Sequence, residues 1–493
     1  MRFSELDGAS IGVWGAGREI GSLADVLARR LPSARIAVAA FDAPPAGDVA
    51  RMLHAPGLRV VTADASLAAG AAPNAGAVPA AGAAPHADAA AAAGDELVAA
   101  LSGCDVVVRS PGVSLYRREL LAVREAGTPV TTATALWLEE RGGEGVIGVT
   151  GTKGKSTTAA LACHLVRAAG RTAQLAGNIG VPALALLEQP QADVTVVELS
   201  SYHTADLRAG PEVAVVTSLF REHTDWHGSE AAYRADKLRL LGLPGVRAAV
   251  VNWRDERLRT ELAGGACDGA GATAGAIQDV PTTPRMLRYG VSDGWDVTAG
   301  GVAFDGELRV ASEELPLLGE HNALNLCGAL AALEALGIAP PLPDALAGFR
   351  PLAHRLETVA ERDGVLWVDD SISTTPESTL AALASFPGRE LVLIAGGQDR
   401  GQDYSTLARV LAERAAAVIG VPTTGPRLVA IARDAGVPPA RAVEVADMRE
   451  AVERARAVAG GSAVVLLSPA APSYDNYRDF EQRGERFRAL VSS

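Results

Sequence analysis

Short apolar runs alternate along the chain with segments in which apolar side chains recur at helical spacing. The run Ile11–Trp14 leads into a glycine-rich turn, and a second run, Ile36–Phe41, ends at Asp42. Between these runs, the apolar positions that share one helix face are Leu23, Val26, Leu27 and Leu31. A strand, a turn, a helix and a strand in this order predict a nucleotide-binding βαβ unit.

The same alternation continues along the rest of the chain, with a helical pattern over Asn322–Leu336. The further apolar runs are Cys104–Arg109, Val146–Thr150, Val194–Val197, Val213–Phe220, Val365–Val368, Leu391–Ala395 and Ala463–Leu467. Continuous apolar strands separated by helices favour parallel sheets that are covered on both faces. We therefore expect an α/β protein built from doubly wound units.

Two linker-like segments divide the chain, which at 493 residues is too long for a single core. Residues 139–145 are charged and Gly-rich, and prolines cluster between Pro340 and Pro351. We predict domains at 1–138, 139–348 and 349–493. Residues 66–94 are nearly all Ala, Gly and Pro, which predicts a flexible surface insertion in the first domain.

Composition narrows the class of protein. A net charge of −13 argues against a broad nucleic-acid surface. The four cysteines are scattered without metal-like spacing, and we find neither an export signal nor an apolar stretch of membrane length. We expect a soluble, cytoplasmic monomer that acts on small molecules.

Lysine is nearly absent from the chain. Only three lysines, Lys153, Lys155 and Lys237, occur among the 45 Lys plus Arg residues. Arginine always keeps its proton, whereas the compact lysine amine can become neutral and nucleophilic. The three retained lysines are therefore candidates for chemistry.

Two of these lysines lie in a glycine-rich loop between a predicted strand and a predicted helix. The loop residues are Gly151, Thr152, Lys153, Gly154, Lys155, Ser156 and Thr157. Backbone N–H groups at a helix N-terminus attract phosphate, a lysine reaches the terminal phosphates, and a serine hydroxyl can bind Mg²⁺. An ordinary strand–helix turn is the alternative, which the paired glycines and lysines disfavour.

Two further segments carry candidate metal ligands. Glu198 ends an apolar strand, where open α/β sheets bind ligands, and its oxygens suit Mg²⁺. His223, Asp225 and His227 imitate a zinc spacing, but no further histidine cluster completes such a site. A single histidine on Mg²⁺ is the preferred interpretation, with surface-loop histidines as the alternative.

Lys237 falls on a predicted amphipathic helix. Most helix lysines are solvated, but here the position requires something that arginine lacks. An amine that combines with CO₂ becomes a carbamate, which is an anionic oxygen ligand for a metal. This chemistry would explain why lysine is retained there.

Three other polar clusters point to ligands. The N-terminal glycines follow the spacing GxGxxxG, one residue off the dinucleotide fingerprint, and alone they would suggest an NAD-dependent oxidoreductase. The loop 177–180, Gly-Asn-Ile-Gly, predicts a ligand-side turn. In Gly319–Asn322, the residue Asn322 either binds a ligand or caps the following helix.

Together these motifs resemble one family, the Mur ligases, which are ATP-dependent amide-forming enzymes of peptidoglycan precursor synthesis. The resemblance covers nearly the whole chain and includes the segments 151–157, 177–180, 198–201, 222–225, 319–322, 354–355, 369–371, 467–473 and 480–484. It implies an N-terminal Rossmann-like domain for a UDP substrate, a central P-loop ATPase domain and a C-terminal Rossmann-like domain for an amino acid.

The resemblance also implies roles for individual residues. ATP would be bound by the loop residues Gly151 to Thr157 and by Asn322, Arg355 and Asp370. Two Mg²⁺ ions would be held by Ser156, Glu198, His223 and carbamylated Lys237. The residues Lys155, Lys237, His223 and Asn178 would be catalytic. Uridine and diphosphate would contact Gly17, Arg18, Glu19, Ser110, Pro111 and Gly112.

The implied reaction is the addition of glutamate to UDP-N-acetylmuramoyl-L-alanine, with Thr374, Arg400, Ser473 and Phe480 binding the glutamate. The chain has Ile372 and Arg400 where enzymes that add D-glutamate have lysines. It resembles instead the branch that adds L-glutamate and depends on a separate epimerase. The same reaction with D-glutamate remains the alternative.

Two more distant alternatives remain open at this point. Folylpolyglutamate synthetase also adds glutamate but lacks an N-terminal UDP-binding domain, whereas here some 130 residues precede the phosphate loop. A non-catalytic scaffold that kept the fold is the other alternative. The presence of Lys155, Glu198, His223 and Lys237 opposes it.

Overall fold

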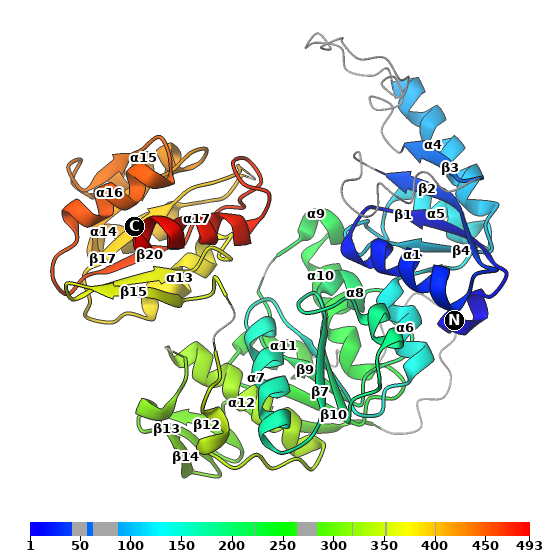
Figure 1. Ribbon diagram of the computed structural model, residues 1–493, viewed down its shortest axis with the longest axis horizontal. Coiled ribbons are helices and arrows are strands. Elements are labelled where there is room, and N and C mark those ends of the chain that lie inside the picture. Colours follow the sequence, from blue (N-terminus) through cyan, green and yellow to red (C-terminus); the bar gives the residue numbers. More distant parts are fainter. Residues whose placement is uncertain are drawn as a thin grey trace. The chain divides into compact units, whose positions relative to one another are not determined.

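The computed structural model describes residues 1–41, 57–62, 87–220, 222–263, 283–317, 319–350, 353–399 and 401–493. Two compact units form: Met1–Ala311 with Leu324–Leu346, and Ser312–Ala323 with Ala347–Ser493 (Figure 1). Both units combine helices with mainly parallel sheets, so the predicted α/β class is confirmed. None of the described helices is both long and apolar enough to cross a membrane.

The first sheet is entirely parallel, with the strand order β3-β2-β1-β4-β5. Its strands are β1 (Ser10–Trp14), β2 (Arg35–Phe41), β3 (Arg59–Thr62), β4 (Val106–Arg109) and β5 (Val130–Thr131). The accompanying helices are α1 (Arg18–Arg30), α4 (Ala87–Ser102), α5 (Arg118–Glu125) and α6 (Ala133–Arg141), after a 3₁₀ turn at Phe3–Leu6. The strand order reverses between β1 and β4, and open α/β sheets bind ligands at such a point.

Helix α4 corrects part of the predicted insertion. Residues 87–94 belong to this helix, because alanine has the highest helix propensity and Leu97 and Leu101 anchor the following turns in the core. The remainder of the predicted insertion, 66–86, lies outside the described residues. A tract rich in alanine was therefore wrongly assigned as flexible over its last turns.

The second sheet is also parallel, with the order β11-β10-β9-β6-β8-β7. Its strands are β6 (Val146–Thr150), β7 (Ala173–Gly177), β8 (Val194–Glu198), β9 (Val213–Val216), β10 (Ala248–Asn252) and β11 (Arg285–Tyr289). The associated helices are α7 (Lys155–Ala168), α8 (Ser201–Thr204), α9 (Thr224–His227), α10 (Glu230–Leu238), α11 (Glu256–Ala263) and α12 (Glu320–Ala335). Short 3₁₀ helices lie at Ala183–Glu188, Arg239–Gly242, Ser312–Glu314 and Asp344–Leu346.

One apolar core joins these first two sheets. It includes Val13 and Val108 from the first sheet, Val197 and Val216 from the second, and Trp137 from α6. The predicted boundary at residue 138 thus falls inside a buried helix. The division of the chain into three domains stays a prediction.

A small antiparallel sheet was not predicted from the sequence. It consists of β12 (Trp295–Thr298), β13 (Gly301–Phe304) and β14 (Glu307–Ala311). Its outer strands are half-buried or exposed at most positions, so they lack the continuous apolar runs that mark the parallel strands.

The second unit contains a sheet in the order β15-β16-β20-β17-β18-β19, in which only the edge strand β15 is antiparallel. Its strands are β15 (Glu357–Arg362), β16 (Val365–Asp369), β17 (Leu391–Ala395), β18 (Ala415–Gly420), β19 (Ala442–Glu444) and β20 (Val464–Leu467). The helices are α13 (Pro376–Ala384), α14 (Ser405–Arg414), α15 (Gly425–Asp434), α16 (Met448–Val458) and α17 (Phe480–Ser492). The three strands predicted here are confirmed within one residue.

Candidate functional site

The glycine-rich loop connects β6 to α7, as predicted, and its two glycines are required by space as well as by conformation. Gly151 and Gly154 have φ values of 142° and 87°. A Cβ atom at Gly151 would lie 2.0 Å from Thr217 Oγ1, and one at Gly154 would lie 2.3 Å from Asn325 Oδ1. The loop therefore keeps its backbone N–H groups at the start of a 14-residue helix only with glycine at both positions.

Residues 217–220 and Tyr233, which sequence reasoning did not assign to the site, form hydrogen bonds with this loop. Thr152 N donates to Ser218 O at 2.8 Å, and Lys153 N donates to Ser218 Oγ at 2.8 Å. Thr152 Oγ1 also lies 2.7 Å from the Tyr233 hydroxyl. Residues 217–220 were predicted to extend strand β9, but their groups bond to the loop and the strand ends at Val216.

The three lysines converge on this loop, each with a different partner. Lys155 Nζ donates to Thr152 O at 3.0 Å, and Lys153 Nζ pairs with Glu222 at 2.8 Å. Lys237 is only 2% exposed and donates from Nζ to Gly151 O at 2.9 Å. The three lysines that the sequence retains thus form one cluster in space.

Lys237 has an unusual protonation equilibrium. Burial lowers the pKa of its amine well below the ordinary value of 10.5, and the charge of Lys155 lowers it further. The carboxylates Glu222 and Glu198 oppose this shift but do not reverse it. A neutral amine is the form that can react with CO₂, so the environment favours the predicted chemistry.

Glu198 and Asn178 form the second part of the site, at the C-terminal ends of β8 and β7. Glu198 is 1% exposed, and its Oε1 accepts a hydrogen bond of 2.8 Å from Asn178 Nδ2. Its other oxygen, Oε2, is buried and has no hydrogen-bond partner among the described residues. Thr157 Oγ1, in the glycine-rich loop, is also buried and also has no hydrogen-bond partner among the described residues. Buried oxygens without partners are costly, and a bound cation would satisfy the carboxylate.

His223 is positioned by a neighbouring aromatic residue. Its backbone is left-handed, with φ 53°, and its Nδ1 lies 2.7 Å from the Tyr202 hydroxyl. Burial lowers the pKa of His223 despite the nearby carboxylate of Glu222. The ring is therefore neutral at physiological pH, which is the form that binds metals.

His227 does not join His223 in a metal site. It is 2% exposed, its Nδ1 lies 2.6 Å from Asp236 Oδ2, and its Nε2 lies 3.0 Å from Ser201 Oγ. Both ring nitrogens are thus engaged by protein groups. The zinc-like spacing is not supported by the geometry.

The loops predicted to bind the UDP moiety pack together at the point where the first sheet reverses its order. A Cβ at Gly15 would lie 2.5 Å from Ser110 Cβ, and one at Gly17 would lie 2.8 Å from Ser110 Oγ. Buried Arg109 stabilises the loop that follows β4, because it donates to Pro111 O at 3.1 Å and to Val113 O at 3.0 Å. Trp226 Nε1 donates to Gly112 O at 3.1 Å.

Arg18 and Glu19 have protein partners in the second sheet's loops. Arg18 donates to the carbonyls of Asn178 and Gly180 at 2.8 and 3.2 Å. Glu19 Oε1 lies 2.6 Å from His203 Nε2. Burial alone would raise the pKa of Glu19, but His203 and Thr134 outweigh burial and lower it. These two residues link the sheets, and their contact with a substrate stays a prediction.

In the second unit, Asp370 follows β16 in a buried environment. Its Oδ1 accepts from Leu356 N at 3.2 Å and its Oδ2 accepts from Ser468 Oγ at 2.8 Å. Burial raises the pKa of Asp370 to about 6, against the hydrogen bonds and the charge of Arg355. Asn322 is the third residue of α12, which begins at Glu320, and its choice between ligand binding and helix capping stays a prediction.

Of the predicted glutamate residues, Thr374 and Ser473 lie in the loops after β16 and β20, and Phe480 is the first residue of α17. Arg400 lies outside the described residues. A residue without an assigned role joins these loops. Arg483, 1% exposed, donates to Ser371 O at 2.8 Å and to Ala471 O at 3.1 Å. The signal that could have identified Arg483 was its position within the quoted motif at 480–484.

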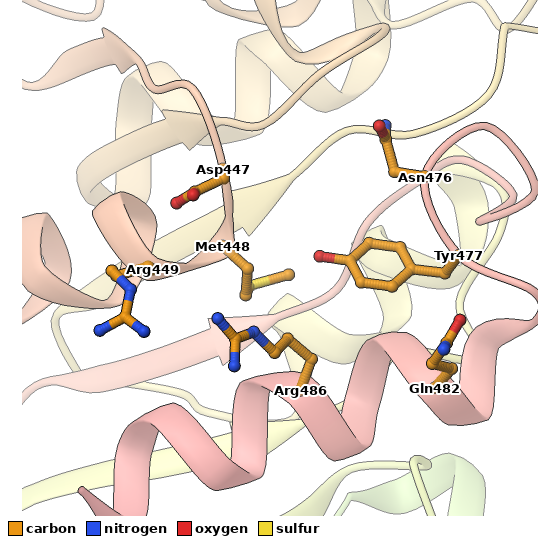
Figure 2. A pocket seen from close by; sticks show the side chains of 7 residues that line it. All are labelled: Asp447, Met448, Arg449, Asn476, Tyr477, Gln482 and Arg486. Atoms are coloured by element: carbon orange, nitrogen blue, oxygen red, sulfur yellow. The ribbon is translucent and has the colours of Figure 1, made fainter.

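A pocket of about 250 Å³ lies beside these loops, between the N-terminal ends of α16 and α17 (Figure 2). It is lined by Asp447, Met448, Arg449, Asn476, Tyr477, Gln482 and Arg486. Within the described residues, neither Arg449 nor Arg486 forms an ion pair. The pocket adjoins the segment between Ser473 and Phe480, but none of the predicted glutamate residues lines it.

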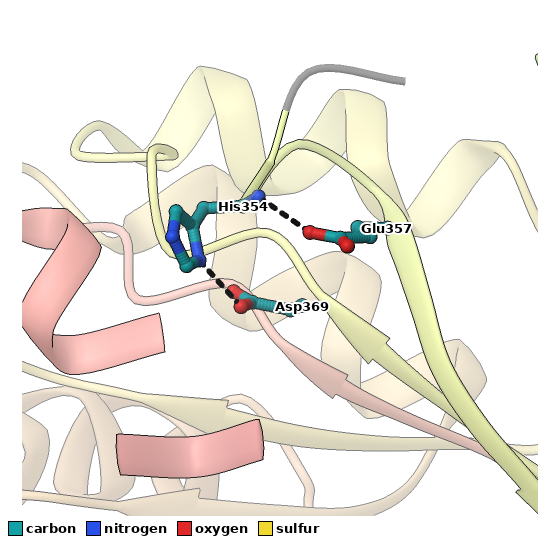
Figure 3. Close-up of side chains that lie close together, drawn as sticks. All are labelled: His354, Glu357 and Asp369. Carbon is teal, nitrogen blue, oxygen red and sulfur yellow. Dashed lines mark hydrogen bonds and ion pairs between the residues drawn. The ribbon is translucent and has the colours of Figure 1, made fainter. Parts of the chain in front are cut away.

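His354, Glu357 and Asp369 cluster in the second unit without forming a metal cage (Figure 3). His354 Nδ1 lies 2.7 Å from Asp369, which raises the pKa of His354. Glu357 accepts from His354 N at 2.9 Å and pairs with Arg488 at 2.6 Å. Since each group already has a partner, the cluster is a structural ion-pair network at the start of this unit.

Comparisons with known proteins agree with this geometry. Residues 149–333 match the Mur ligase middle domain, and residues 354–471 match the Mur ligase glutamate ligase domain. A UDP-N-acetylmuramoyl-L-alanine--L-glutamate ligase of Micromonospora sp. is 43% identical over 100% of this chain and 98% of its own. The Salinispora tropica protein of the same name is 41% identical over 100% and 99%.

A solved structure shares the fold. The crystal structure of a MurF ligase from Thermotoga maritima in complex with ADP has a TM-score of 0.54 and 16% sequence identity. The match covers 99% of this chain and 96% of that chain.

We predict that Gly154→Ala weakens ATP binding at least about tenfold, since strain of about 1–3 kcal/mol and the clash with Asn325 both distort the loop. Isothermal titration calorimetry with MgATP measures the loss. Gly170→Ala is the matched control, because Gly170 has φ 78° but open space around it. Unchanged ATP affinity in Gly154→Ala would contradict the role of this close approach.

We predict that Asp370→Asn raises the melting temperature at pH 8. The folded-state pKa of about 6 exceeds the ordinary value of 3.8, so the stability contributed by this group falls as pH rises between these values. Replacing the ionised form should stabilise the protein by about 1–3 kcal/mol at pH 8, and less toward pH 5. Calorimetry of the full chain tests this.

Asp399→Asn serves as the comparison for this measurement. Backbone and Arg427 contacts lower the pKa of exposed Asp399, so its replacement should give no stabilisation. A lower melting temperature of Asp370→Asn at pH 8, or a gain that grows toward pH 5, would show that burial does not disfavour the Asp370 charge.

Proposed function

Because the chain belongs to the Mur ligase family, we propose that it adds L-glutamate to UDP-N-acetylmuramoyl-L-alanine with consumption of ATP. The observation that carries the proposal is the convergence of Lys155, Lys237, Glu198 and His223 around one glycine-rich loop. Relatives that share this reaction in their names match the chain from end to end. We place the enzyme in the cytoplasm, in peptidoglycan synthesis and therefore in cell growth and division.

The proposed reaction has two steps. The carboxylate of the muramoyl-alanine attacks the γ-phosphorus of ATP, so that a P–O bond forms, ADP leaves and an acyl phosphate results. The neutral amine of glutamate then attacks the acyl carbon, inorganic phosphate leaves, and the nitrogen loses a proton. Both steps gather negative charge at one place, which calls for fixed cations and exclusion of water.

The residues of the first unit have matching roles in this proposal. The N–H groups of Gly151 to Thr157 bind the phosphates, and Lys155 turns from Thr152 O toward the terminal phosphate. Ser156, Glu198, His223 and carbamylated Lys237 would hold two Mg²⁺ ions, which neutralise charge on the phosphates. Buried Glu198 Oε2 supports this assignment, because it has no partner among the described residues. Asn178 fixes the Glu198 carboxylate.

Carbamylation of Lys237 would form one N–C bond and release one proton. The lone pair of neutral Nζ forms a bond to the carbon of CO₂, one C–O π pair moves onto oxygen, and the nitrogen releases a proton to water. The lowered pKa of Lys237 supplies the neutral amine. The product carries a negative charge, which the nearby Lys155 and Lys153 offset.

The remaining substrate contacts are assigned by loop position. Gly17, Arg18, Glu19 and Ser110 to Gly112 flank the point where the first sheet reverses and would bind the uridine diphosphate. Asn322, Arg355 and Asp370 would contact ATP, and Thr374, Arg400, Ser473 and Phe480 the glutamate. The presence of Ile372 and Arg400 in place of lysines supports L-glutamate, since an arginine fork and an apolar side chain hold carboxylates differently from lysines. A separate epimerase would then act on the product.

The five-stranded N-terminal sheet argues against the folylpolyglutamate synthetase alternative, because that enzyme has no UDP-binding domain. The NAD-dependent alternative rested on the N-terminal glycines, yet here they pack against Ser110 in a loop pair without the dinucleotide spacing. A scaffold role is opposed by the intact lysine cluster. These observations support a muramoyl-alanine ligase over the three alternatives.

The enantiomer of glutamate provides the test. Purified protein with ATP, Mg²⁺ and UDP-N-acetylmuramoyl-L-alanine should release phosphate rapidly with L-glutamate and at least about tenfold more slowly with D-glutamate. The reason is that a glutamate site that binds both carboxylates and the amine fits only one enantiomer. Reactions without the muramoyl substrate control for simple ATP hydrolysis. Faster release with D-glutamate would overturn the assignment, and no release with either enantiomer would overturn the ligase itself.

A further inference from the structure

A chain of hydrogen bonds adjoins the candidate site and has no part in the reaction described so far. It is buried at its serine and histidine, whereas its tyrosine, Tyr116, is 44% exposed. His227 Nδ1 lies 2.6 Å from Asp236 Oδ2, and His227 Nε2 lies 3.0 Å from Ser201 Oγ. The same Asp236 oxygen receives the Tyr116 hydroxyl at 2.7 Å. We call Tyr116, Asp236, His227 and Ser201 the tyrosine–aspartate relay.

The relay imitates a Ser–His–Asp catalytic arrangement, but its burial excludes that chemistry. Ser201 and His227 are each only 2% exposed, which leaves no space for a substrate at the serine oxygen. Its members act through their neighbours in the chain, so they are positioning residues.

Three members of the relay adjoin residues of the candidate metal site. Asp236 directly precedes Lys237 on α10, Ser201 follows Glu198 by three residues at the end of β8, and His227 ends the short helix that His223 precedes. A displacement of the relay therefore moves the backbone that carries Glu198, His223 and Lys237.

The fourth member connects this backbone to the first sheet. Tyr116 lies in the loop that follows β4, six residues after Ser110 and four after Gly112. Burial and the adjacent Asp236 raise the pKa of Tyr116, so its hydroxyl keeps its proton and donates to the carboxylate. Ser114 Oγ donates to Trp226 O, and Trp226 Nε1 donates to Gly112 O, which ties the same loop to α9.

We propose that the tyrosine–aspartate relay couples occupancy of the Ser110–Tyr116 loop by a uridine diphosphate to the position, and hence the carbamylation, of Lys237. The inference rests on the proposed function, which supplies both the ligand of the loop and the carbamate. A ligand that orders this loop fixes Tyr116, which in turn fixes Asp236 and the adjoining Lys237. Binding at one site then favours a reactive geometry at the other, without contact between ligand and lysine.

The test measures the carbamate itself rather than ligase activity. Full-length protein without ATP is titrated with ¹³C-labelled bicarbonate, and the carbamate carbon is followed by NMR with and without saturating UDP. In the wild type, UDP should raise the apparent affinity for CO₂ about fivefold or more. Tyr116→Phe and Asp236→Asn should lose this response, with saturation of each variant by UDP verified by calorimetry.

Two variants calibrate the measurement. Lys237→Arg should show no carbamate signal, and Tyr474→Phe, at an exposed tyrosine of the second unit, should respond to UDP like the wild type. A full UDP response in Tyr116→Phe, or none in the wild type, would overturn the coupling while leaving the carbamate intact. Absence of any carbamate in the wild type would instead overturn the proposed role of Lys237.

Discussion

The burial of one lysine, Lys237, next to the glycine-rich loop at 151–157 is the constraint on which the site depends. Lys237 Nζ lies 2.9 Å from the carbonyl of Gly151, and Lys155 adds a second positive charge nearby. Water cannot screen these charges at a position that is 2% exposed, so the protein must neutralise the amine, pair it with an anion, or accept a large penalty. The lowered pKa of Lys237 is the first response. In the proposed function, a bound triphosphate would supply an anion for the lysines, and carbamylation would convert the Lys237 amine itself into an anion.

The parallel sheets bring the partners of this lysine together. Strands β6, β8 and β9 are neighbours in the sheet. The glycine-rich loop follows β6, Glu198 ends β8, and residues 217–220 follow β9. The C-terminal ends of parallel strands share one edge, so residues far apart in the sequence meet there. The first sheet repeats this arrangement with the loops after β1 and β4, and the second unit repeats it with Asp370 and Ser473.

Much of the fold and of the site could be predicted because buried parallel strands leave a local signal. The runs at 146–150 and 391–395 match β6 and β17 residue for residue. The strands of the small antiparallel sheet were not predicted, because their side chains are mostly half-buried or exposed and so leave no continuous apolar run. The helical end of the alanine tract escaped because composition alone does not show that Leu97 and Leu101 anchor it. His227 was misleading because its spacing from His223 says nothing about the burial that commits it to Asp236 and Ser201.

The proposed function depends on activation of the muramoyl-alanine carboxylate as an acyl phosphate at this lysine-lined loop. The direct measurement uses UDP-N-acetylmuramoyl-L-alanine labelled with ¹⁸O in its carboxylate, turned over with ATP and L-glutamate, with the released phosphate examined by ³¹P NMR. If the carboxylate is activated in this way, one labelled oxygen passes from the carboxylate to phosphate in each turnover. Phosphate that forms without the label would contradict it.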